Sequence, residues 1–141
     1  MILPLVKKIT LIIIFLTAFQ IAGQEIGNIY KNNHFIKLNK TASDFCLIYS
    51  DINSNNLFFE NSIQFSNKET IYNIIINGFK KKNNHQVFIK TNNNIIVKLK
   101  YIHLRGEKLL SIKHNNLSNK TRGQSHFFTQ EDFEQLFSST I

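Results

Sequence analysis

The sequence has one cysteine, one proline and no tryptophan, and only 18% of its 141 residues are charged. Because Cys46 has no second cysteine to pair with, an internal disulfide is excluded, and with it a disulfide-stapled scaffold. Cys46 lies in the strand-like run 45–49, where we interpret it as a small buried apolar residue and not as a reactive or intermolecular thiol. A hydrophobic fraction of 43% is enough for one domain with a core of its own.

Motifs for catalysis and metal binding are also missing. The sequence contains no G-x-S-x-G, no P-loop and no G-x-G-x-x-G, and Cys46 has no evident histidine partner. The five histidines lack the close paired spacing of a zinc site: His34, His85, His103, His114 and His126. We therefore predict no metal, no cofactor and no catalytic residues, and we favour a non-enzyme. An active site assembled only in space stays open as an alternative.

No apolar run reaches the roughly 18–20 residues that a membrane-spanning helix needs. The most apolar run, residues 9–19, follows two lysines and leads to small residues ending at Gly23. This order is typical of a secretory signal peptide, so we predict a signal peptide at 1–23, cleaved near Gly23. The protein would then be exported to the periplasm or the extracellular space, with no stable membrane span after cleavage. An uncleaved anchor is the competing interpretation.

Beyond the predicted signal peptide, short apolar runs alternate with turns rich in Asn and Ser, a pattern typical of antiparallel strands. We expect three strands in the first half, at 35–38, 45–50 and 62–65. A helical period follows, with apolar or small residues on one face at Ile71, Ile74, Ile75, Gly78 and Phe79. Ser66 is placed to cap this helix in a capping box with Glu69. Lysines 80–82 follow, where cations favour the negative end of a helix.

The second half repeats this order. We expect strands at 87–91, 95–104, 108–114 and 124–128. Thr129 then caps a helix with Phe133, Leu136 and Phe137 on one face, and Phe128 is placed to contact Phe133 in a hydrophobic staple. The sequence therefore predicts an α+β fold made of two consecutive antiparallel β-meander-plus-helix units. The units would occupy about 33–79 and 85–138 of a single domain, 24–141.

The hairpin around Gly106 allows its register to be predicted. If Arg105 and Gly106 form a two-residue turn, the numbers of paired residues sum to 211. The pairs are then Leu99–Ile112 and Tyr101–Leu110 on one face, and Lys98–Lys113 and Lys100–Ser111 on the other. Such a register separates apolar from basic side chains, as a half-buried antiparallel pair requires.

Positive charge is concentrated in the second half. Residues 80–122 hold eleven Lys or Arg and one acidic residue, whereas 24–79 and 123–141 carry net charges of −1 and −3. A concentrated basic surface attracts polyanions through its field and through counterion release. The candidate anion-binding residues are Lys98, Lys100, Lys113 and Arg105. The ordinary alternative is a solvated sheet face that lysines keep soluble and protect from edge pairing.

Two resemblances rest on these residues. The end of the chain, from Phe128-Thr129 to Leu136-Phe137, resembles that of small exported bacterial proteins of uncharacterised function, which implies no activity. The segment 97–112, followed by a helix, is similar to a PUR repeat. PUR repeats are sheet-then-helix units that pair to bind single-stranded nucleic acid with basic and aromatic side chains. The resemblance implies a binding role only for Lys98, Lys100 and Lys113. We expect few aromatic side chains beside them on the predicted face.

The leading functional hypothesis is non-enzymatic binding of a protein or polyanionic partner in the cell envelope or outside the cell. The partner itself is unknown. The polyanions considered are lipopolysaccharide, acidic polysaccharide and nucleic acid. PUR-like single-stranded nucleic-acid binding is the first alternative, and an enzyme with a site not visible in sequence is the second.

Overall fold

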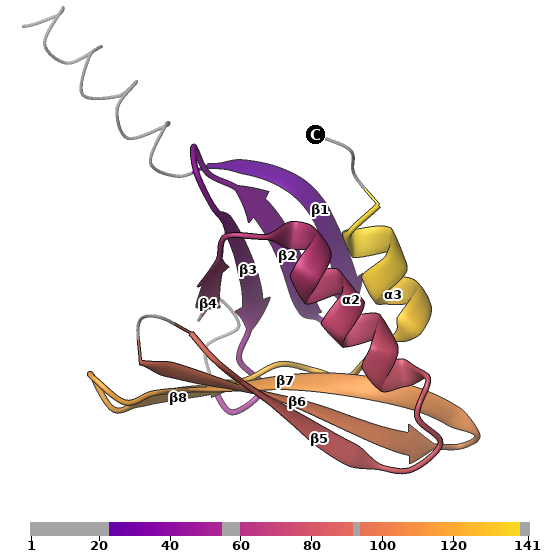
Figure 1. Ribbon diagram of the computed structural model, residues 1–141. Helices are drawn as coiled ribbons and strands as arrows, with labels where there is room; N and C mark the ends of the chain where they lie inside the picture. The colour runs from indigo at the N-terminus through magenta and orange to yellow at the C-terminus, as the bar shows by residue number, and fades with distance from the viewer. Residues whose placement is uncertain (1–22, 55–59, 92–93, 139–141) are drawn as a thin grey trace, which may run out of the picture.

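The computed structural model describes residues 23–54, 60–91 and 94–138. Nearly all of the predicted signal peptide therefore lies outside the described residues, and the export of the protein stays a prediction. Over the described ranges the chain forms two antiparallel sheets and two helices, which confirms the predicted α+β class (Figure 1). Within the same ranges, no helix combines the length and apolarity needed to cross a membrane.

The first unit is a four-stranded meander followed by a helix. Its strands are hydrogen-bonded in chain order: β1 Gln24–Lys31, β2 His34–Lys40, β3 Phe45–Ser50 and β4 Glu60–Phe65. Helix α2, Lys68–Phe79, follows. The sequence did not predict β1, because a bulge between Glu25 and Gly27 breaks its alternation. Ile26 and Ile29, three residues apart, both reach the core as a result.

The second unit repeats the meander. Its strands are β5 His85–Lys90, β6 Ile95–Leu104, β7 Glu107–Asn116 and β8 Thr121–Gln124, and helix α3, Gln130–Leu136, closes the unit. The predicted strand at 124–128 was wrong, because the chain leaves the ladder after β8 and rejoins β7 as the two-residue strand β9, Phe128–Thr129. Ser125 marks the break. Its hydroxyl, in place of a backbone carbonyl, accepts the Ile112 amide at 2.9 Å.

Helix α3 begins as predicted. The Thr129 hydroxyl accepts the Asp132 amide at 3.1 Å, and the Asp132 carboxylate accepts the Thr129 amide at 2.9 Å, which completes a capping box. The rings of Phe128 and Phe133 pack edge to face with centroids 6.2 Å apart. The predicted hydrophobic staple is therefore confirmed.

The predicted cap of α2 was wrong by one residue. Asn67, not Ser66, accepts the Thr70 amide at 3.0 Å through its side-chain oxygen. With the cap at Asn67, the third helical position is Thr70, so Glu69 cannot complete a capping box. Both Ser and Asn are good caps, and the sequence alone does not choose between neighbours.

The β6–β7 hairpin has the predicted register. Lys98 pairs with Lys113, Leu99 with Ile112, Lys100 with Ser111 and Tyr101 with Leu110. Arg105 and Gly106 form the turn with φ of 54° and 79°, the two positive values that a type I′ turn requires. The hairpin therefore has one apolar face and one face that carries Lys98, Lys100 and Lys113, with Ile102 and Leu109 nearer the turn on the lysine face.

The two sheets and both helices enclose one core. Figure 1 shows the strands of the two sheets crossing at a steep angle, with α2 and α3 beside each other along one flank. Tyr101 lies fully buried at the centre, and its hydroxyl donates to the Ile75 carbonyl at 2.7 Å. Gly78 permits this approach, because a Cβ there would lie 2.1 Å from the Tyr101 ring. One face of the second sheet is thus committed to the core, and the other points away from it.

Candidate functional site

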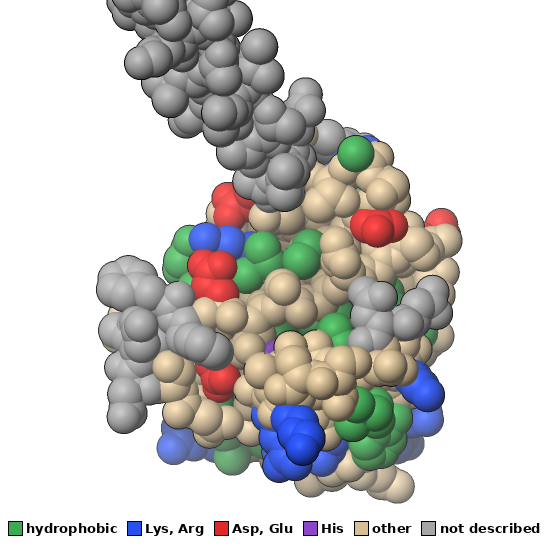
Figure 2. All heavy atoms as spheres, turned by 90° about the vertical axis from the view of Figure 1, so that its left-hand side faces the viewer, with side chains coloured by type: hydrophobic (Ala, Val, Ile, Leu, Met, Phe, Trp, Pro, Cys, Tyr) green, Lys and Arg blue, Asp and Glu red, His purple; other side chains and the backbone are tan. Residues whose placement is uncertain are grey.

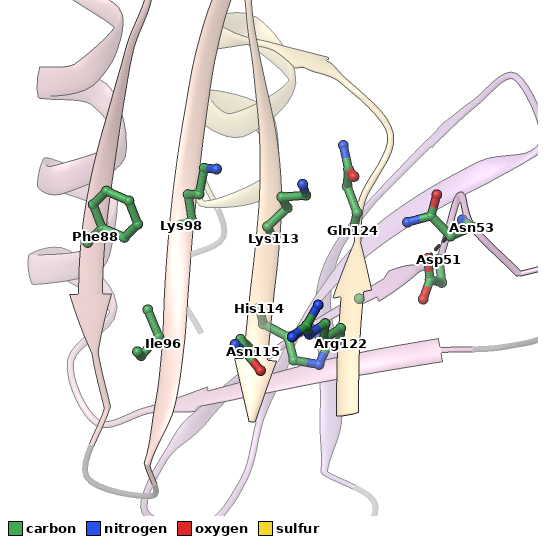
Figure 3. A pocket seen from close by; sticks show the side chains of 11 residues that line it. Asp51, Asn53, Phe88, Ile96, Lys98, Lys113, His114, Asn115, Arg122 and Gln124 are labelled. Atoms are coloured by element: carbon green, nitrogen blue, oxygen red, sulfur yellow. Dashed lines mark hydrogen bonds between the residues drawn. The ribbon is translucent and has the colours of Figure 1, made fainter. Parts of the chain in front are cut away.

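The face of the second sheet that points away from the core, here called the outer face, carries the candidate residues. Pairing across β5, β6, β7 and β8 aligns one outward side chain from each strand: Phe88, Lys98, Lys113 and Gln124. We call these four residues the central row, and Figure 3 shows their side chains on the same side of the sheet. Because neighbouring strands lie about 4.8 Å apart, the central row spans about 14 Å.

The outer face is hollowed along this row. An open groove of about 640 Å³ is lined by the central row and by parts of the next row, including Ile96, Asn115 and Arg122. The groove ends beside the loop that follows β3, which contributes Asp51 and Asn53 (Figure 3). A backbone hydrogen bond of 3.0 Å from the Ile52 amide to the Gln124 carbonyl holds this loop against β8. The groove therefore joins the two halves of the chain.

Cations dominate the outer face. They alternate outward along the strands at Lys90, Lys98, Lys100, Lys113 and Arg122. Among the described residues, the ion pairs join Lys31 to Asp132 and Lys37 to Glu25, and none includes a cation of the outer face. In Figure 2 most of the visible Lys and Arg side chains lie over the lower part of the molecule, where the second sheet lies, and most of the acidic side chains lie above them. An uncompensated field of this kind attracts anions.

The structure brings together three of the four predicted anion-binding residues. Lys98 and Lys113 face each other across β6 and β7 inside the groove. Lys100 lies two residues further along β6, about 7 Å away. Arg105 occupies the exposed hairpin turn, roughly 20 Å from Lys98 along the strand, and lies apart from the other three.

Sequence reasoning missed Phe88. Phe88 is 65% exposed, and it lies in the central row, paired with Lys98. The expectation of few aromatic side chains beside the lysines was therefore wrong at this position, where Phe88 is paired with Lys98. The signal was available in the alternation of β5, where Val87 and Ile89 turn toward the core and the aromatic residue between them must turn outward.

A buried polar cluster lies below the β8 end of the groove. His114 faces inward from β7, and its Nδ1 is hydrogen-bonded to the Tyr49 hydroxyl. Burial lowers the pKa of His114 and outweighs the negative charge of Asp51, which acts to raise it. Burial also raises the pKa of Tyr49. The bond therefore joins a neutral imidazole to an un-ionised phenol. This bond ties β3 to β7 and anchors the first sheet to the second.

Cys46, the only cysteine of the sequence, lies outside the residues that line the groove. Cys46 is half-buried on β3, and burial raises the pKa of its thiol, which weakens it as a nucleophile. In the described ranges, no group of three or more His, Cys, Asp or Glu side chains is placed to hold a metal ion. The groove can attract anions with its lysines and cover a flat apolar ring with Phe88.

Comparisons with known proteins give a limited result. No protein-family model and no curated protein matches this sequence. Among solved structures, the chain is similar to WHY1 from Arabidopsis thaliana, with a TM-score of 0.48 and 11% identity over 81% of this chain and 85% of that chain. It is also similar to the plant transcriptional regulator PBF-2 (TM-score 0.48, 13% identity, 81% and 77% covered). WHY3 from Arabidopsis thaliana gives a TM-score of 0.46 and 12% identity, with 79% and 80% covered. Similarity at this level supports no statement about function.

Proposed function

We propose that this protein binds single-stranded nucleic acid, without catalysis, in the groove on the outer face of its second sheet. The observation that carries the proposal is the row of side chains across three neighbouring strands: Phe88 on β5, Lys98 on β6 and Lys113 on β7. A phosphodiester backbone needs cations, and an unpaired base needs a flat apolar surface to stack on. The central row offers both within about 10 Å.

The exposed ring favours a single strand over a duplex. Bases in a duplex are already stacked on each other, so an aromatic side chain on an open sheet could reach only their backbone or edges. Unpaired bases present free π-faces, and stacking of one base on an aromatic side chain contributes about 1–3 kcal/mol. Phe88 on β5 is paired directly with Lys98 on β6, so one nucleotide could stack on the ring while its phosphate is neutralised by the lysine.

The same lysines would attract other polyanions, including lipopolysaccharide and acidic polysaccharide, because counterion release does not depend on the identity of the polymer. Phe88 and the neighbouring Ile96 are the apolar part of the groove, and they favour a ligand with flat apolar rings. Export, as predicted from residues 1–23, is retained in the proposal, and the ligand would then be nucleic acid outside the cytoplasm.

Fluorescence anisotropy with a labelled single strand of about 16 nucleotides tests the proposal, with a duplex and an acidic polysaccharide as competitors. We expect affinity to fall steeply with salt. Lys98→Ala with Lys113→Ala should reduce the slope of log K against log salt by about 1.4, at about 0.7 per lost phosphate contact. Phe88→Ala should weaken binding by about 5- to 150-fold with the slope unchanged.

Lys40→Ala is the matched control, because Lys40 is an exposed lysine at the end of β2, away from the groove. Its affinity should stay within about twofold of the wild type. Equal losses for Lys40→Ala and Lys98→Ala would reject the groove as the site. Polysaccharide that competes as well as the single strand, together with no effect of Phe88→Ala, would reject nucleic acid in favour of general polyanion binding.

A further inference from the structure

The cationic groove has an acidic end. Asp51 comes from the loop after β3 and lines the groove beside Gln124, at the edge of the sheet opposite Phe88 (Figure 3). Among the residues that line the groove it alone is acidic, whereas the centre holds Lys98 and Lys113. The two ends of the groove therefore differ in chemistry: an aromatic ring at the β5 edge and a carboxylate at the β8 edge.

The position of the carboxylate is fixed by three bonds. The Asn53 amide donates to Asp51 Oδ1 at 2.9 Å, and Asn61 Nδ2 donates to Oδ2 at 3.2 Å. The Ile52 amide bonds to the Gln124 carbonyl at 3.0 Å and keeps the loop against β8. Among the described residues, each carboxylate oxygen accepts one donor, while a carboxylate can accept about four. Asp51 is only 8% exposed but lines the groove, so a further donor from a ligand would have to reach it from the groove.

A fixed carboxylate decides which part of a nucleotide can lie next to it. A phosphate there would be repelled, so phosphates are directed to the lysines at the centre of the groove. A base can occupy the acidic end if it presents an N–H donor. The cytosine N4 amino group is a donor that Asp or Glu accepts, whereas thymine presents the O4 acceptor at the equivalent position. The N3–H of an unpaired thymine is also a donor, but it lies between two carbonyl oxygens that repel a carboxylate.

We propose that Asp51 makes the groove selective for a base with an exocyclic amino group over thymine or uracil. The inference rests on the proposed function, and it adds a specificity-determining residue to that site. Cytosine and thymine are the informative pair, because both are single-ring bases of similar size and differ at this position chiefly in donor against acceptor.

The test compares oligo(dC) with oligo(dT) of equal length near neutral pH. The wild type should bind oligo(dC) about 5- to 10-fold more tightly, as expected for a single base-edge contact. Asp51→Asn keeps an oxygen for the Asn53 amide but loses the charge. It should bind the two strands within about twofold of each other, chiefly through tighter binding of oligo(dT).

Glu107→Gln is the matched control, because it removes the same charge from the second sheet at the hairpin end, away from Asp51. It should leave the ratio of the two affinities unchanged. A ligand-side test avoids any question of folding: N4,N4-dimethylcytosine, which lacks amino protons, should lower wild-type affinity to that of oligo(dT).

Two results would overturn the assignment of Asp51: equal wild-type affinities for the two strands, or a preference that persists in Asp51→Asn. In either case, binding that still depends on Lys98 and Phe88 would leave the proposed function standing. Absence of binding to every single strand would instead remove the proposed function itself.

Discussion

At the scale of single residues, Phe88 is placed where it contributes little to folding. With 65% of its surface exposed, the side chain gains only part of the roughly 1.5–3 kcal/mol that full burial of Phe would provide. Phe88→Ala should therefore change the free energy of unfolding by less than about 0.5–1 kcal/mol. Chemical denaturation measures this change. Phe128→Ala, at a fully buried position, should cost about 3–5 kcal/mol and serves as the comparison.

The buried His114 predicts how stability depends on pH. Burial lowers its pKa in the folded protein below the ordinary value of 6.5. Above that value the imidazole is neutral in both states, and stability is complete. As the pH falls below 6.5, the unfolded chain takes up the proton first, so stability falls until the folded pKa is reached and then levels off.

We therefore expect the free energy of unfolding to decline as the pH falls from about 7 through 6.5 and below, and His114→Gln to remove part of that decline. Urea denaturation across this range provides the measurement. His126→Gln should remove a further part of the decline in unfolding free energy, because burial and the charges of His34 and Lys31 lower the pKa of His126 as well. An identical pH profile in His114→Gln and the wild type would contradict the assigned state of His114.

At the scale of elements, Gly78 in helix α2 is a position where replacement by Ala should lower stability. Replacing Gly by Ala inside a helix ordinarily stabilises it by about 1 kcal/mol. Here a Cβ would lie 2.1 Å from the buried Tyr101 ring, so Gly78→Ala should destabilise the protein instead. Asn73→Ala, at an exposed position of the same helix, should be neutral or slightly stabilising. Thermal unfolding of the two variants would decide, and stabilisation by both would show that α2 has room to move away from β6.

The strands also show which features could be predicted from the sequence and which could not. The β6–β7 register was predictable because a two-residue turn at Arg105-Gly106 and a clean alternation specify the same pairing. β1 was missed because its bulge removes the period of two. β9 was missed because the Ser125 side chain replaces a backbone acceptor in the ladder, which no local pattern reveals.

The residues of the candidate site also fall into those that a local sequence pattern predicts and one that it does not. Lys98, Lys100 and Lys113 were predictable from charge and alternation, and Phe88 could have been found from the alternation of β5. Asp51 could not, because it reaches the groove only through the packing of the loop after β3 against β8. Contacts between segments this far apart in the chain depend on the whole fold and leave no periodic signal.

At the scale of the whole molecule, the two units correspond strand by strand. Leu38 in β2 and Leu99 in β6 both face the core, and Lys37 and Lys98, one residue before them, both face outward. These two pairs of residues therefore occupy equivalent positions in the two units, and each unit ends in a helix capped by a side-chain oxygen, from Asn67 in the first and Thr129 in the second.

The predicted signal peptide is tested on the whole protein in its native cell. Mass spectrometry of fractionated cells should detect a mature N-terminus at Gln24, outside the cytoplasm. The resulting chain, 24–141, would carry 15 basic and 9 acidic residues and a net charge of +6. An intact Met1 in a membrane fraction would favour the uncleaved anchor, and an intact Met1 in the cytoplasm would exclude export.

The likeness of the two halves makes their difference in charge informative. In the first sheet, the positions that match the central row hold Asn28, Lys37, Ile48 and Ser62, and the one lysine among them is paired with Glu25. In the proposed function, the first half therefore supports the fold and the second half provides the contact surface. If the proposed function holds, one molecule of the protein can hold a single strand on one side only, so it should coat nucleic acid and not cross-link it into a network.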